Sequence, residues 1–173
     1  MRHVLKHQRA TLLVLGMVAG LAVGVLWPRT PLQAVATDRY ENFAIATGPL
    51  DNDVEALYFL DSVTGDLTAV VLSTQSGKFN SFYKYNILND LGVDPSKNPR
   101  FLITTGIADL RRGSARLRPG LSVVYIAELT TGKVGAYALP WARERHNAGK
   151  PFVGTFVPLD VAQLRTTAVR QQQ

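Results

Sequence analysis

Apolar and polar positions follow the same order in two segments of the chain. The first, 56–73, reads ALYFLDSVTGDLTAVVLS, and the second, 123–140, reads VVYIAELTTGKVGAYALP. Each has an apolar run, an acid, a Thr-Gly pair three residues later and a second apolar run. Two β-rich runs around a short polar loop with glycine predict a β-hairpin. We expect Gly65 and Gly132 to lie in the turns at positive φ, which glycine adopts at low cost.

The remaining apolar runs predict further strands and little helix. Tyr58 and Tyr125 should occupy equivalent places in the strands before the two turns. Other strands are expected at 43–47, 79–85, 101–105 and 152–157. Short helices are expected at 86–91, with Gly92 as its C-cap, and at 159–169. The pattern predicts a mainly β domain over residues 38–170, with an antiparallel sheet built from the two Tyr-containing hairpins and one or two short helices.

The N-terminal segment predicts a transmembrane helix ahead of this domain. Residues 10–27 carry no charge and follow a start with three basic residues. The run reaches the lower edge of the ~17–25 residues that span a bilayer, and the basic flank keeps the N-terminus inside. We interpret 1–27 as a signal-anchor and 28–37 as a linker. The body then lies on the periplasmic side of the inner (cytoplasmic) membrane, as a single-pass protein.

A second interpretation of this segment stays open. The small-x-small run 34–36 is a candidate signal-peptide cleavage site, and cleavage near Ala36 would leave a secreted body. The apolar run exceeds the ~7–15 residues of an ordinary signal-peptide core, which favours the anchor. Gly16, Gly20 and Gly24 share one helix face, and such G-x-x-x-G spacing lets transmembrane helices associate closely. Glycine is also simply frequent in membrane helices, so self-association is one of two explanations.

Charge narrows the range of partners. The net charge of +6 and the pI near 9.8 point to a polyanion, but from Thr37 onward 15 Lys+Arg stand against 13 Asp+Glu, a net of +2. A near-neutral body makes nucleic acid an unfavoured partner. Residues 38–94 hold nine acids and three bases, whereas 97–173 hold four acids and twelve bases. If these halves fold side by side, the dipolar surface favours head-to-tail association.

Two stretches carry candidate binding chemistry. The densest basic stretch is a candidate contact with an anionic surface such as lipid headgroups, and it comprises Arg111, Arg112, Arg116 and Arg118. A solvated loop is the favoured alternative. An aromatic strand is a candidate stacking platform for a glycan or small ligand, through Phe79, Tyr83 and Tyr85. Cross-strand pairing within a sheet is the commoner role of such residues.

No catalytic, cofactor-binding or metal-ligating residue is assigned from the sequence, and no cofactor is expected. The chain has no cysteine, and it lacks the phosphate-loop, G-x-S-x-G and H-E-x-x-H patterns. Residues 51–55 resemble the start of a calcium loop, but the sixth position is not glycine and the twelfth, Ser62, is not glutamate. A solvated acidic turn is favoured there. His146, the only histidine of the body, is interpreted as a surface residue rather than a metal ligand.

Three segments carry a family resemblance. NFAIATGP at 42–49, LYFLDSVTGDL at 57–67 and GVDPSKNPRF at 92–101 resemble a group of exported, membrane-anchored proteins of planctomycete bacteria, over about 38–168. The resemblance implies an envelope location and no particular activity. The hairpins are also loosely similar to those of β-propeller blades. Two or three hairpins are too few to close a propeller of ~4–8 four-stranded blades.

Three functions fit these observations. The first is a membrane-anchored, envelope-facing β domain with an interaction or structural role, with the membrane and a protein partner or another copy as contacts. The second is a glycan- or small-ligand-binding module that uses strand 79–85. The third, a divergent hydrolase, is the least favoured because no catalytic motif is present. A deep polar pocket would favour the second or third, whereas an apolar patch or open strand edge favours the first.

Overall fold

The computed structural model describes residues 16–17, 37–40, 42–110 and 118–165. The chain divides into two compact units, 1–33 and 34–173. Among the described residues, no helix has the length and apolar character needed to cross a bilayer. Most of the predicted signal-anchor lies outside the described residues, which include only Gly16 and Met17 of it. The linker lies outside them too, including the cleavage candidate at 34–36, and Thr37 alone is described.

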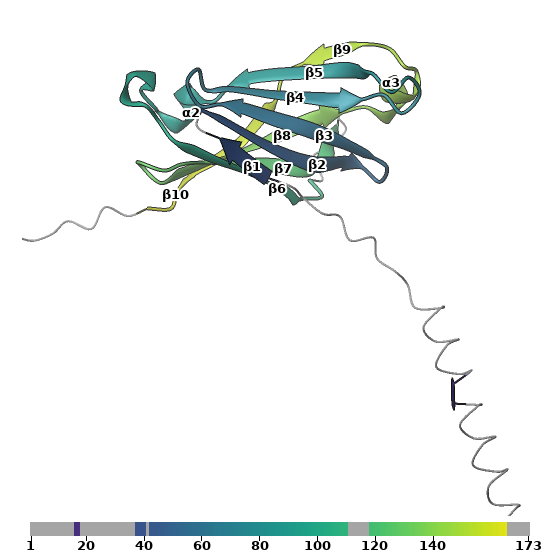
Figure 1. Cartoon of the computed structure of the whole chain (residues 1–173), viewed down its shortest axis with the longest axis horizontal. Helices are drawn as coiled ribbons and strands as arrows, with labels where there is room; N and C mark the ends of the chain where they lie inside the picture. The colour runs from purple at the N-terminus through teal and green to yellow at the C-terminus, as the bar shows by residue number, and fades with distance from the viewer. Residues whose placement is uncertain (1–15, 18–36, 41, 111–117, 166–173) are drawn as a thin grey trace, which may run out of the picture. The chain divides into compact units, whose positions relative to one another are not determined.

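The body is built from two β-sheets, which we call sheet A and sheet B (Figure 1). Sheet A has the order β1 (Thr37–Tyr40), β2 (Phe43–Asp51), β3 (Val54–Asp61), β4 (Asp66–Leu72), β5 (Phe79–Asn86), β9 (Phe152–Gly154). Sheet B has the order β10 (Val157–Gln163), β8 (Lys133–Trp141), β7 (Arg118–Glu128), β6 (Phe101–Ile107). All neighbours are antiparallel except β5 and β9. The prediction of a mainly β, mostly antiparallel body is confirmed, but the two hairpins belong to different sheets rather than one.

Helix is short and local. Helix α2 (Leu88–Leu91) ends at Gly92 with φ of 62°, as the glycine C-cap predicts. Helix α3 (Arg143–Asn147) and the single 3-10 turn η1 (Pro95–Lys97) complete the described helical residues of the body. The amphipathic helix expected from residue 159 is wrong where it can be checked, because 159–163 belong to strand β10. Pairing with the open edge of β8 satisfies backbone groups on both strands there, and this outweighs a weak helical pattern.

The sheets enclose one apolar core. Tyr58 and Tyr137 are the largest of its fully buried side chains, and Phe156 enters it from the connection between β9 and β10. The Tyr58 hydroxyl lies 3.1 Å from the Ser122 hydroxyl of the opposite sheet, and burial raises the pKa of Tyr58 to about 12. The sheets come close together at Gly48, where an added Cβ would lie only 2.8 Å from the Ser122 hydroxyl oxygen.

The predicted repeat of the hairpins extends to four strands. Strands β2–β3–β4–β5, which we call repeat 1, and β6–β7–β8–β10, repeat 2, share the same strand register. Phe43 pairs with Asp61 in repeat 1, as Phe101 pairs with Glu128 in repeat 2. At the other side of each hairpin, Asp66 pairs with Asn86 and Lys133 with Gln163.

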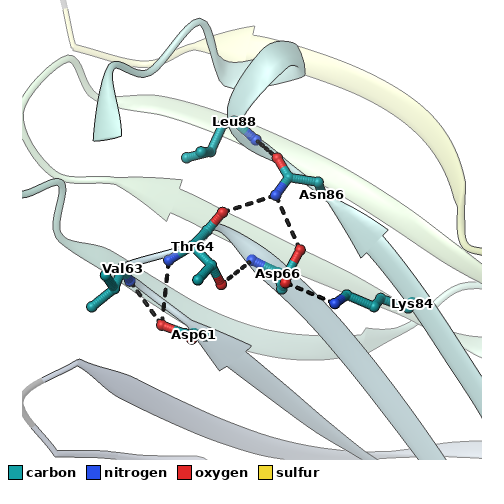
Figure 2. A network of polar contacts seen from close by, with 7 residues as sticks. All are labelled: Asp61, Val63, Thr64, Asp66, Lys84, Asn86 and Leu88. Atoms are coloured by element: carbon teal, nitrogen blue, oxygen red, sulfur yellow. Dashed lines mark hydrogen bonds and ion pairs between the residues drawn. The ribbon is translucent and has the colours of Figure 1, made fainter. Parts of the chain in front are cut away.

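The two turns are held by the same contacts, and Figure 2 shows the one made by Asn86 in the first turn. The backbone carbonyl of the acid accepts from the turn glycine amide. Gly65 donates to Asp61 at 2.8 Å, and Gly132 donates to Glu128 at 2.9 Å. The last side chain of the fourth strand donates to the turn threonine carbonyl, from Asn86 at 2.8 Å and from Gln163 at 2.6 Å. Both glycines have positive φ, 71° and 74°, as predicted.

The repeats bury opposite faces. Tyr58 and Tyr125 occupy equivalent positions, opposite Ala69 and Ala136 respectively, as the sequence predicts. Tyr58 is fully buried, whereas Tyr125 is 36% exposed. The face that repeat 1 turns toward the core is therefore the face that repeat 2 turns outward.

Candidate functional site

The outer face of sheet A is the principal candidate surface. Side chains alternate across a strand, so the residues between the buried positions of β2, β3, β4 and β5 point away from the core. The large apolar side chains exposed on this face are Phe43, Ile45, Leu57, Phe59, Leu72 and Phe82. The rings of Phe43 and Phe59 lie against each other with centroids 5.2 Å apart.

One apolar row crosses the sheet. Thr47, Leu57, Val70, Phe82 and Val153 are successive register partners on five neighbouring strands. The phenylalanines of the face are 37–45% exposed, and at ~150–250 Å² per ring they leave roughly 250 Å² of aromatic surface between them. With the aliphatic side chains, the patch reaches the ~300–600 Å² that commonly marks an interaction site.

Acidic groups border this face where the first hairpin turns (Figure 2). Asp66 forms an ion pair with Lys84 at 2.8 Å, and hydrogen bonding to Lys84 and Asn86 lowers the pKa of Asp66. The Asp61 carboxylate accepts from the Val63 amide at 2.8 Å, so it closes the turn. Because these carboxylates already hold the turn together, the apolar side chains are the groups that the outer face of sheet A offers to a partner.

The outer face of sheet B is also apolar but has smaller side chains. Leu102 and Tyr125 are exposed on β6 and β7, and Val161 is exposed on β10. Around the Tyr125 ring lie Ala127 and Ala136, half-buried, and Gly106, whose added Cβ would meet that ring at 3.2 Å. The body therefore presents two apolar sheet faces: the outer face of sheet A carries aromatic side chains, and that of sheet B carries mostly small ones.

An open groove lies at one end of the body. It has a volume of about 260 Å³ and is lined by Asn42, Ser62, Val63, Pro95, Asn98, Pro99 and Arg100. Its lining contains no aromatic ring and no carboxylate. The hydroxyl oxygen of Ser62 is itself buried and without a hydrogen-bond partner among the described residues. None of the lining residues belongs to the aromatic strand 79–85 that the sequence singled out.

The aromatic strand does not form an exposed platform. Tyr83 is 2% exposed, and its hydroxyl donates to the Pro140 carbonyl at 3.0 Å; burial raises its pKa to about 12. Tyr85 packs against the core and donates to the Asp90 carboxylate at 2.9 Å. Phe79 is exposed because a register shift between Val71 and Leu72 changes the alternation at the start of β5. The three side chains therefore serve the core and the strand end rather than one ligand.

The other predicted site residues are scattered. Arg118 is exposed at the start of β7, whereas Arg111, Arg112 and Arg116 lie outside the described residues. Gly16 lies in the short described helical stretch with open space around it, and Gly20 and Gly24 lie outside. The acidic turn at 51–53 does bind a cation, but it is the Arg143 guanidinium, 3.4 Å from Asp51. No group of three or more potential metal-ligating side chains occurs in the described part of the chain.

The surface position expected for His146 is wrong. The side chain is 3% exposed, and its ring lies 5.0 Å from that of Trp141, centroid to centroid. Its Nε2 atom lies 3.3 Å from the Thr74 hydroxyl. The loop expected around it contains helix α3 instead, and this helix turns the imidazole inward.

Sequence reasoning missed most of the outer face of sheet A, although one signal was present. Strand β2 begins with FAIATG and β6 begins with FLITTG, so both share F-x-I-x-T-G. This match extends the hairpin repeat back by one strand and identifies Phe43 and Ile45.

Comparison of the chain with protein-family models, with curated proteins and with solved structures finds no match.

Proposed function

We propose that this protein is a membrane-anchored, envelope-facing interaction module that binds further copies of itself through the apolar outer face of sheet A. The observation that carries the proposal is the contiguous aromatic and aliphatic face on that sheet. Surfaces of this size and composition on a folded body are typical of protein interfaces. The N-terminal segment holds the body at the membrane, where G-x-x-x-G spacing brings copies together.

Another copy is the favoured occupant for two reasons. The anchor restricts copies to one membrane, which raises the effective concentration of one body near another. The two halves of the chain also carry opposite charge, with nine acids against three bases in 38–94 and four against twelve in 97–173. One copy therefore offers the complementary charge that another requires. The ligand-binding alternative is less supported, since Tyr83 and Tyr85 face the core.

The test is self-association of the full chain, measured by fluorescence energy transfer between differently labelled copies in liposomes. Phe59→Glu places a charge in the centre of the face and should raise the dissociation constant at least tenfold, because burial of one such ring stabilises by ~1.5–3 kcal/mol. Val63→Glu is the matched control, since Val63 is 56% exposed but lies in the turn. Equal association of wild type and Phe59→Glu, with both folded by circular dichroism, would contradict the proposal.

A further inference from the structure

The outer face of sheet A carries the side chains that repeat 2 buries. Equivalent strands β2 and β6 contribute the pattern F-x-I-x-T, as Phe43, Ile45, Thr47 and as Phe101, Ile103, Thr105. In β6 the Phe and Ile are 0% and 3% exposed, whereas in β2 they are 45% and 40% exposed. The same side chains that form core in one repeat are therefore left open in the other.

The outer face of sheet B has, in turn, the composition of the face that sheet A buries. On β3 the buried set is Ala56, Tyr58 and Leu60, and the equivalent set on β7 is Val123, Tyr125 and Ala127, of which Tyr125 is 36% exposed and Val123 only 2%. On β4 the buried set is Leu67, Ala69 and Val71, and its equivalent on β8 is Val134, Ala136 and Ala138, of which Ala138 is fully buried. The residue pattern of each outer face thus matches one side of the interface that already holds the chain's own sheets together, and on sheet B the part of this pattern open to another copy lies around Tyr125.

We propose that copies of this chain stack head to tail, with the outer face of sheet A of one copy packed on the outer face of sheet B of the next. The stacking repeats, between chains, the packing of sheet A on sheet B within the chain. This inference rests on the proposed self-association and adds to it the geometry of the contact. Because the two surfaces differ, the contact is heterologous, and it closes into a ring or continues as a filament.

Shape and charge both favour this arrangement over a symmetric one, in which the outer faces of sheet A of two copies pack on each other. In the head-to-tail stack, the aromatic side chains of sheet A meet the alanines and glycine around Tyr125. In the symmetric arrangement, the aromatic rings of one copy would meet those of the other. Residues 38–94, which supply all of sheet A except β9, carry nine acids and three bases, a net of −6. Residues 97–173, which supply sheet B, carry four acids and twelve bases, a net of +8. A head-to-tail contact joins the segment of net negative charge to the segment of net positive charge, whereas a symmetric contact joins the negative segment to itself.

The internal interface specifies the contacts. Within the chain, a Cβ added at Gly48 would lie 3.1 Å from the Thr105 Cβ. The equivalent of Gly48 is Gly106, and the equivalent of Thr105 is Thr47. Thr47 of one copy should therefore approach Gly106 of the next.

Disulfide cross-linking of the full chain in membranes tests this contact. The protein has no cysteine, so Thr47→Cys and Gly106→Cys each introduce a single thiol and the double variant introduces two. Under oxidation, the double variant should form a ladder of species beyond the dimer, with at least tenfold more cross-linked product than either single variant. Disulfides need Cβ atoms ~3.5–4.5 Å apart, so the readout is specific to close approach.

A second pair guards against misfolding of the Gly106→Cys chain, whose side chain meets the Tyr125 ring. Tyr58 and Ser122 touch across the internal interface, and their equivalents on the outer faces are Tyr125 and Glu55. The Glu55→Cys/Tyr125→Cys chain should form the same ladder with a short bis-maleimide, and each single variant should not. Dimers from Thr47→Cys alone, or a self-associating chain that yields no ladder with either pair, would overturn the stacking while leaving self-association intact. A wild-type chain without energy transfer would remove the self-association itself.

Discussion

At the residue scale, the Glu128 carboxylate accepts three hydrogen bonds from the turn that follows it. It accepts from the amides of Thr130 and Thr131, at 2.8 and 2.6 Å, and from the Thr131 hydroxyl at 2.7 Å. Burial pushes the pKa of Glu128 upward, but the hydrogen bonds from Thr131 and Thr130 outweigh it, and the pKa lies below its usual value. A carboxylate held in this way stabilises the fold only while it is ionised.

We expect Glu128→Gln to lower the free energy of unfolding by roughly 1–3 kcal/mol at pH 7, because an amide offers one acceptor oxygen where three donors converge. The folded pKa is depressed, so this stabilisation is present above the unfolded pKa of ~4.3 and is lost as the pH falls through the folded pKa. Urea unfolding at pH 7 and pH 3 should show a large difference between variant and wild type at the higher pH and a small one at the lower.

Glu144→Gln, an exposed position in α3, serves as the control and should change little at either pH. The pKa values of Asp66 and Asp94 are also lowered, so wild type and Glu128→Gln should both lose some stability in acid. An equal deficit for Glu128→Gln at pH 3 and pH 7 would show that its cost is packing rather than charge.

At the element scale, the hairpin turns depend on glycine for two separate reasons. Gly65, Gly77 and Gly132 all have positive φ. An added Cβ at Gly132 would lie 2.1 Å from the Arg165 Cβ and 3.1 Å from its backbone nitrogen, whereas at Gly77 nothing lies within 4 Å. The turns of the repeat are thus both left-handed and covered by the segment that follows the fourth strand.

We expect Gly77→Ala to cost about 1–2 kcal/mol, the penalty of the left-handed conformation alone. Gly132→Ala should cost a further ~1–3 kcal/mol, because the residue 165 backbone must move. Gly65→Ala should fall between them, since its added methyl meets the flexible Leu88 side chain. Thermal unfolding of the three variants ranks them, and equal costs at Gly77 and Gly132 would contradict the covered-turn account.

At the scale of the whole molecule, the close approach of the sheets at Gly48 determines how the body closes. β2 lies against both β6 and β7 there, and the Thr105 hydroxyl donates to the Thr47 carbonyl at 2.6 Å. We expect Gly48→Ala to cost ~1–3 kcal/mol, because the methyl would displace Ser122 and disturb its contact with Tyr58. Chemical denaturation measures the loss. Gly106→Ala, the equivalent position on an outer face, should cost clearly less in the dissociated protein, and a reversed order would contradict the equivalence of the two glycines.

The same scale explains why the body has two apolar outer faces. A repeat that stacks front to back buries one face of each unit and leaves one face of each unit outward. Two repeats therefore end in two unmatched surfaces, and these are the surfaces that carry the proposed assembly. Terminal units of stacked repeats normally have polar outer faces, which sheet A lacks at Phe43, Ile45 and Phe59.

Sequence alone determined the local features of this protein. The Thr-Gly turns, the glycine cap at Gly92 and the equivalence of Tyr58 with Tyr125 follow from backbone sterics and strand alternation, which act over a few residues. Tertiary structure decided which face of each repeat is buried, that residues 159–163 pair with β8 as a strand, and that His146 lies inside. Burial and edge pairing depend on which segment packs against which, and two repeats of one pattern carry no local signal that assigns opposite faces to the core.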